Sequence, residues 1–164
     1  MWNIKTSLRR GALAALVVAG LVGAPGVHAE SLTCVEFVQR ASTVALHGNA
    51  WQWWSAAAGR YDRGRQPYPG AVMVFAKSRA LPLGHVAKVR VVRDRRTILV
   101  DHANWSPIRG RRGQVEWAVA VVDVSPANDW SRVRVWYRPA ADVGHTVYQV
   151  NGFVYPAAVR HHAR

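Results

Sequence analysis

Apolar and polar positions divide the chain into a helical first part and a longer second part made of strands. Beyond residue 33, apolar positions recur at the spacing of one helix face: Phe37, Val38, Ala41 and Ala45. From residue 71 onward, short apolar or alternating segments separated by turn residues are typical of β-strands: 71–75, 84–92, 97–102, 115–124, 132–137 and 146–155. Helices followed by a run of strands predict an α+β fold, with N-terminal helices packed on an antiparallel β-sheet.

The first 29 residues have a different pattern, which is that of a secretory signal peptide. Residues 1–10 carry basic and no acidic side chains, residues 11–22 are apolar, and small residues lead up to Ala29. The apolar run is shorter than the ~20 residues that span a bilayer, so a retained membrane anchor is the less favoured alternative. We expect cleavage after Ala29, no membrane span after cleavage, and a protein that is periplasmic or secreted.

Basic residues greatly outnumber acidic ones, with 22 Lys and Arg against 9 Asp and Glu and a net charge of +13. Only Lys5, Arg9 and Arg10 among the basic residues precede Ala29, and no acidic residue does, so the exported part stays strongly basic. A basic surface attracts anionic partners. An exported protein meets anionic cell-wall polymer or a membrane surface before nucleic acid. A solvated, solubilising surface is the alternative for most of the arginines.

The single cysteine, Cys34, stands where a helix is expected to begin. Thr33 and Glu36 have the spacing of a capping box, which makes Cys34 the first helical residue. The unpaired N–H groups of a first turn favour a thiolate and can hold an oxyanion. One cysteine cannot form an internal disulfide, so the two alternatives are a nucleophile and a small buried apolar residue.

Strand alternation places two candidate partners of Cys34 on one face of the sheet. His85 lies on the apolar face of its strand, the face expected to pack against the helices. On the next strand Asn104 also lies on the apolar face, whereas Asp101 points the other way. If both apolar faces belong to one face of the sheet, His85 and Asn104 look toward the helix that carries Cys34. The alternative for His85 is a hydrogen-bonded core histidine.

Several short segments, taken in chain order, resemble the CHAP family, the cysteine, histidine-dependent amidohydrolases and peptidases. The segments are Cys34–Val38, Gly48–Ala50, Pro69–Phe75, Gly84–Val89 and Asn104–Trp105. The resemblance covers about residues 31–124. It implies a papain-like α+β fold, an exported bacterial protein, and hydrolysis of amide or peptide bonds in peptidoglycan.

The resemblance also implies roles for individual residues. Cys34 matches the nucleophile, His85 the general base, and Asn104 the polar residue that orients the imidazole. This chain departs from many members at one position, because His102 stands where they carry a glutamate, two residues before that Asn. No Gln or Tyr lies close before Cys34 to complete an oxyanion hole, which leaves Ser31 and the Cys34 backbone N–H.

Tryptophan is frequent in the chain, and four of these residues flank the expected site: Trp51, Trp53, Trp54 and Trp105. Aromatic faces stack on sugars and peptides, so we interpret Trp53, Trp54 and Trp105 as substrate-binding residues, with core packing as the alternative for each. No set of His, Cys and Asp residues has zinc spacing, so we expect no metal and no cofactor. His161 and His162, late in the chain, belong to a basic tail, residues 157–164.

Together these features predict an exported cysteine hydrolase that cleaves peptidoglycan amide or peptide bonds through a Cys34–His85–Asn104 site and a thioester intermediate. Residues 1–29 form the signal peptide, and residues 30–156 form one CHAP-like catalytic domain. We expect a monomer whose partner is peptidoglycan, with no specific nucleic-acid ligand. Two alternatives stay open: a non-catalytic cell-wall or polyanion-binding protein on the same fold, and an exported nucleic-acid binder.

Overall fold

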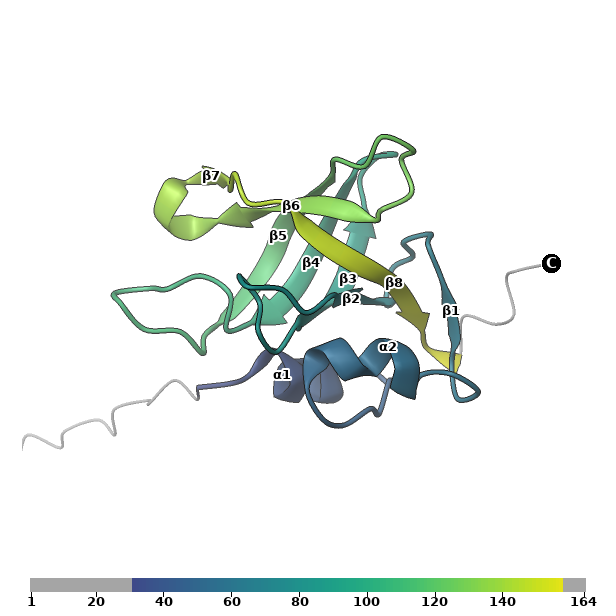
Figure 1. Ribbon diagram of the computed structural model, residues 1–164. Coiled ribbons are helices and arrows are strands. Elements are labelled where there is room, and N and C mark those ends of the chain that lie inside the picture. Colours follow the sequence, from purple (N-terminus) through teal and green to yellow (C-terminus); the bar gives the residue numbers. More distant parts are fainter. Residues whose placement is uncertain (1–30, 158–164) are drawn as a thin grey trace, which may run out of the picture.

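The computed structural model describes residues 31–157, whose elements are shown in Figure 1. The signal peptide expected at residues 1–29 lies outside the described residues, as does nearly all of the basic tail. The helical elements come first: α1 (Cys34–Ala41), the 3-10 helix η1 (Ala50–Gln52) and α2 (Trp53–Ala56). The strands follow, with a second 3-10 helix η2 (Arg138–Ala140) between β6 and β7: β1 (Asp62–Gly64), β2 (Val72–Phe75), β3 (His85–Val92), β4 (Thr97–Ala103), β5 (Val115–Asp123), β6 (Arg132–Tyr137), β7 (Asp142–Val143) and β8 (Tyr148–Tyr155).

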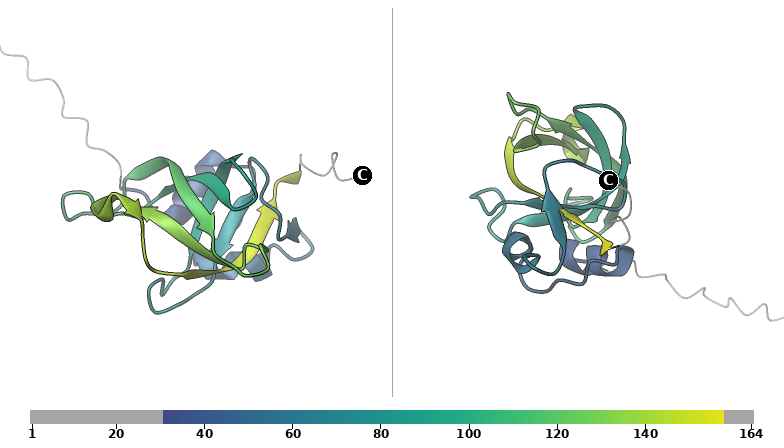
Figure 2. Two further views of the ribbon diagram at one scale, coloured as in Figure 1. Left: turned by 90° about the horizontal axis from the view of Figure 1, so that it is seen from above. Right: turned by 90° about the vertical axis from the view of Figure 1, so that its right-hand side faces the viewer.

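Six of these strands close into a barrel. From β2 to β6 the strands pair antiparallel in chain order, and β8 pairs with β2 on one side and with β6 on the other. Met73 lies opposite Phe153 at the first of these two contacts, and Arg132 lies opposite Gln149 at the second. The short strands β1 and β7 extend β8 and β6 at their edges. Figure 2 shows the barrel from two further sides.

The predicted α+β, papain-like fold with N-terminal helices packed on an antiparallel sheet is therefore wrong, because the protein is mostly β. The strands lie close to their predicted positions and pair antiparallel, but the helices are too small to form a layer: α1 has 8 residues and α2 has 4. The helix expected to reach Ala45 ends at Ala41, where Ser42 takes an extended conformation. No helix within residues 31–157 is long and apolar enough to cross a membrane.

Closure of the barrel gives its strands an apolar core on each side. The interior core fills the barrel and includes Phe75, Ala87, Val89, Val100 and Trp105. A second core lies between the outside of the barrel and the helices, and includes Phe37, Val38, Val74, Val86 and Ala103. Figures 1 and 2 show α1 and α2 together on that side. β2 is buried at every position because both of its faces meet a core, which explains its continuous apolar run.

The strand face that meets the helices differs from the one expected. Val86 packs against the helices, whereas Ala87 and Val89 point into the barrel. The expectation that the face carrying His85 packs against the helices is therefore wrong for β3 as a whole. His85 still comes close to the start of α1 because it is the first residue of the strand, where the barrel interior opens.

Candidate active site

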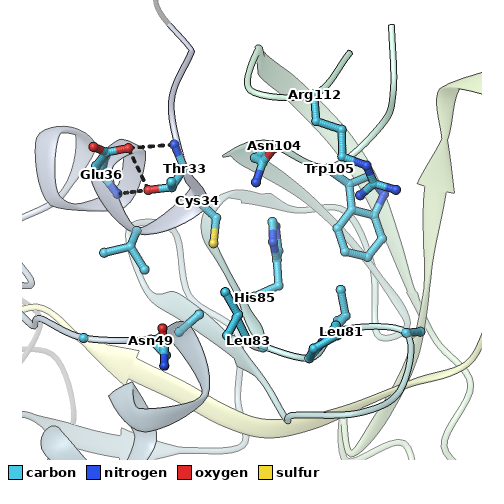
Figure 3. Close-up of a pocket in the computed structure, with 16 residues that line it drawn as sticks. Thr33, Cys34, Glu36, Asn49, Leu81, Leu83, His85, Asn104, Trp105 and Arg112 are labelled. Carbon is cyan, nitrogen blue, oxygen red and sulfur yellow. Dashed lines mark hydrogen bonds between the residues drawn. The ribbon is translucent and has the colours of Figure 1, made fainter. Parts of the chain in front are cut away.

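Cys34 is the first residue of α1, and a capping box fixes its position. Oγ1 of Thr33 accepts a hydrogen bond from the Glu36 N–H at 3.2 Å, and the Glu36 carboxylate accepts one from the Thr33 N–H at 2.8 Å. The predicted helix start is confirmed. The side chain of Cys34 is partly buried, and its sulfur points toward the His85 ring (Figure 3).

His85 begins β3, and the loop before it determines where its ring lies. Gly84 has a φ of +69°, and a Cβ at this position would lie 2.6 Å from the backbone nitrogen of Trp51. The N–H of Trp51 also donates to the Leu83 carbonyl at 3.2 Å. Only glycine fits this close approach, which ties the loop to η1 and brings His85 and Cys34 to the wall of one cavity.

A second histidine contacts the far side of the His85 ring. Nε2 of His85 lies 3.0 Å from Nδ1 of His102, which is wholly buried on β4. Trp105 packs against both imidazoles, with ring-centroid distances of 4.8 Å to His85 and 5.5 Å to His102. Because Nε2 is engaged, Nδ1 is the nitrogen of His85 that remains available to another partner.

Asn104 was expected to approach the far nitrogen of His85, and in this respect the expectation is wrong, because His102 makes that contact. Asn104 follows β4 with a φ of 64° and lines the same cavity. In Figure 3 its side chain lies above the His85 ring. Asp101 points to the other side of the strand, as predicted, and its carboxylate accepts a hydrogen bond from Nε of Arg90 at 2.7 Å.

Cys34, His85 and His102 follow one another in a line, and burial favours the neutral form of each of these three ionisable groups. Burial raises the pKa of the Cys34 thiol, although backbone N–H groups, that of Val86 foremost, act in the opposite direction. Burial lowers the pKa of His85 well below its ordinary value, and His102 and Arg112 lower it further. Burial also lowers the pKa of His102, to about 3. Near neutral pH the site therefore holds a thiol and two neutral imidazoles.

The cavity beside Cys34 has a volume of about 620 Å³. Its walls come from the start of α1, the segment before η1, the loop that precedes β3 and the segment after β4. The loop contributes mostly apolar residues: Ala80, Leu81, Pro82, Leu83 and Gly84. Within residues 31–157, no group of three or more His, Cys, Asp or Glu side chains is arranged to hold a metal ion.

Of the three tryptophans expected to bind substrate, the structure brings only Trp105 to this cavity. Trp105 is 4% exposed, and its ring packs against Phe75 and Tyr148 as well as against the two histidines. Trp53 is wholly buried in the second core. Trp54 packs against the same core and lies under the guanidinium of Arg63, 4.7 Å from its ring centroid.

The amino-acid sequence from residue 26 to residue 104 matches the family model of the CHAP domain. This range contains α1, β3 and β4, and with them Cys34, His85 and His102. This match identifies a CHAP domain within the chain. CHAP domains are generally amidases or peptidases, and the match supports a peptidoglycan-hydrolase-type function of the kind typical of secreted proteins that act on the cell wall. A search of curated proteins found no match.

Two features of this CHAP site were missed by the sequence analysis. The role of His102 had a signal, because this histidine stands where many members of the family carry a glutamate. The sequence held no signal that Arg112 belongs to the site, because this residue comes from a loop between β4 and β5 that no motif marks. Only the fold of that loop brings its side chain to the cavity.

Proposed function

We propose that this protein is an exported cysteine hydrolase that cleaves an amide or peptide bond of peptidoglycan, with Cys34 as nucleophile and His85 as general base. One observation carries the proposal. The thiol at a capped helix start faces the His85 ring, and the far nitrogen of that ring contacts His102 at 3.0 Å. The whole line lies inside the CHAP match, which supports peptidoglycan as the substrate.

The contact between the two histidines favours the tautomer in which His85 is a base. When the Nε2–H of His85 donates to Nδ1 of His102, Nδ1 of His85 keeps a lone pair that faces the thiol. His102 then carries its own proton on Nε2, a buried atom without a hydrogen-bond partner in the described chain. A buried polar atom without a partner lowers the free energy of unfolding by about 1–3 kcal/mol. The role of His102 in orienting the His85 ring explains why the site keeps this unfavourable feature. His102 is thus a positioning residue.

Catalysis starts from a neutral pair. As the Cys34 sulfur attacks the carbonyl carbon, the thiol proton moves to Nδ1 of His85, so no thiolate has to accumulate. The N–H groups of Cys34 and Val35 lie in the first turn of α1, where the helix offers them no carbonyl, and they receive the oxyanion.

The second half of the reaction reverses the proton transfer. The His85 imidazolium gives its proton to the leaving nitrogen as the C–N bond breaks, which leaves a thioester on Cys34. Water then attacks the thioester with His85 as base, releases a carboxylic acid and restores the thiol. Asn104 lines the cavity beside these groups and completes its polar wall.

A neutral His102 gives this site a different resting state from one with a carboxylate in that place. A carboxylate beside His85 would stabilise the imidazolium and so favour a thiolate. His102 supplies an acceptor without a charge, and the thiol stays protonated until substrate arrives. Since oxidation follows thiolate character, a neutral resting thiol suits a lone cysteine that works outside the cytoplasm.

Digestion of purified peptidoglycan, followed by mass spectrometry of the soluble products, tests the proposal. A hydrolase releases fragments with a new amine and a new carboxyl end, and their masses identify the bond that was cut. If the protein binds the wall and produces no new ends, the non-catalytic wall-binding alternative is correct. Determination of the N-terminus of the secreted protein tests export, with cleavage expected after Ala29.

A further inference from the structure

A groove continues from the cavity beside Cys34 to a second cavity. The first has a volume of about 620 Å³ and the second about 380 Å³, and a small cavity of about 40 Å³ lies between them. The small cavity shares Trp105 with the first and Tyr148 with the second. Arg112 lines all three. The three cavities therefore form one path that passes along Arg112.

The second cavity is built from a part of the chain that the CHAP match does not include. Its walls come from β6, η2 and the segment that leads into β8: Val135, Tyr137, Ala140, Gly144, His145, Thr146 and Tyr148. All of these residues lie after residue 104, where the match ends. The far end of the groove thus lies beyond the matched region of this chain. It is placed to select among substrates that the CHAP domain could cleave by the same chemistry.

Arg112 is an exposed cation at the junction of the groove. The ion pairs of other arginines join Arg90 to Asp101 and Arg96 to Asp123, and no carboxylate within residues 31–157 pairs with Arg112. Figure 3 shows Arg112 with Trp105 on the side of the pocket opposite the capping box. Its guanidinium is therefore available to a ligand.

The charge of Arg112 also acts on the general base. It opposes protonation of His85, which the reaction requires when the thiol proton is transferred. An anion bound to the guanidinium would cancel this opposition in the complex, while the empty site would keep it. A ligand carboxylate at this position therefore favours the proton transfer in addition to binding.

We propose that the groove binds an acidic peptide, with Arg112 holding a substrate carboxylate between the scissile bond and the second cavity. This rests on the proposed function and adds to it the charge and the direction of the substrate. A guanidinium matches a carboxylate with two parallel hydrogen bonds, and peptidoglycan stem peptides carry carboxylates. The apolar loop at the first cavity contacts the aliphatic part of the peptide, and the polar second cavity receives the segment beyond the carboxylate.

Calorimetry on the full chain with Cys34→Ala tests binding without turnover. The probes are a synthetic stem peptide with free carboxylates and the same peptide with every carboxylate amidated. We expect the free form to bind about tenfold more tightly, and Arg112→Gln to remove that difference. The matched control is Arg111→Gln, which changes the same charge on the same loop at a residue that lines none of the three cavities. The control should keep the difference.

The outcomes separate this proposal from the proposed function. If Arg112→Gln retains the preference for the free peptide, or Arg111→Gln loses it equally, the groove proposal is overturned. Hydrolysis by the protein with Cys34 intact gives the second readout: equal kcat/KM for the free and amidated peptides also overturns it, while the proposed function stands. A preference in binding that depends on Arg112, with no bond cleaved, supports the groove and contradicts the hydrolase.

Discussion

The two ends of the line from Cys34 to His102 are built in opposite ways. The Cys34 end is local and partly exposed, because Thr33 and Glu36 form the cap within one helical turn. The His102 end is wholly buried and depends on contacts between strands, since its partner His85 lies 17 residues away in the chain. A short motif therefore places the nucleophile, whereas the barrel places the base. Loss of the cap alone should therefore cost little stability, whereas loss of His102 should disturb the position of the base.

Replacement of His102 tests the buried end and should cause the largest loss of activity among the variants that keep Cys34. His102→Leu removes the acceptor for His85, so the ring loses its preferred tautomer and orientation. We expect kcat to fall on the order of 10²-fold with little change in KM. His102→Asn keeps a side-chain oxygen near the former Nδ1 and should retain part of the rate. Initial rates of fragment release provide the measurement, and wild-type kcat in His102→Leu would contradict the positioning role.

Acid should destabilise the buried end selectively. The pKa of His102 is lowered from its ordinary 6.5 to about 3, so the unfolded chain binds this proton at a higher pH than the folded protein does. The contribution of neutral His102 to the free energy of unfolding is fully present above pH 6.5. It is lost as the pH falls from 6.5 toward 3, by up to ~1.4 kcal/mol per pH unit. Denaturant unfolding at several pH values should give a shallower dependence in His102→Asn. If the free energy of unfolding depends on pH equally in the wild type and in His102→Asn, the pH dependence arises from groups other than His102.

Removal of the helix cap tests the local end. Thr33→Ala deletes the acceptor for the Glu36 N–H and should lower the free energy of unfolding by about 1 kcal/mol. Thermal unfolding should show a Tm lower by a few degrees. Thr43→Ala, in the exposed loop after α1, is the matched control and should leave Tm unchanged. An unchanged Tm in Thr33→Ala would contradict the role of the cap in stabilising the start of α1.

Salt should weaken the interactions of the exposed charges and leave the buried line nearly unaffected. This is the smallest of the expected effects. Exposed charges are screened within about 10 Å at 0.1 M salt, whereas the Cys34–His85 pair is enclosed. Raising the salt concentration should weaken binding to insoluble wall a few-fold and leave kcat on a short neutral peptide nearly unchanged. A triple replacement of Arg109, Arg111 and Arg112 by Gln should reproduce the effect of salt on wall binding. Wall binding indifferent to salt would reduce these arginines to a solubilising surface.

The same contrast explains what the sequence could predict. The start of α1 was predictable because Thr33, Cys34 and Glu36 interact within one turn, and the strands were predictable from their apolar spacing. Closure of the barrel was not, because the pairing of β8 with both β2 and β6 joins segments far apart in the chain. The N-terminal segments were overread as a helical layer for the same reason, since the length of α1 depends on where the loop to η1 must run.

The third member of the line shows how register limits prediction. Alternation places His102 and Asn104 on the same side of β4, and it cannot say which one reaches His85. The pairing of β3 with β4 and of β4 with β5 shifts register near these residues. β4 ends at Ala103, and the positive φ of Asn104 turns the chain out of the strand. His102 therefore stays aligned with His85, and Asn104 does not.

Peptidoglycan digestion by the wild-type protein and by Cys34→Ala, side by side, tests the central claim most directly. The substitution removes one sulfur from a partly exposed helix start, so Tm should match that of the wild type. We expect the wild type to release soluble fragments and the variant to release none above the blank without protein. Release at the wild-type rate by a folded Cys34→Ala variant would contradict the assignment of Cys34 as the nucleophile.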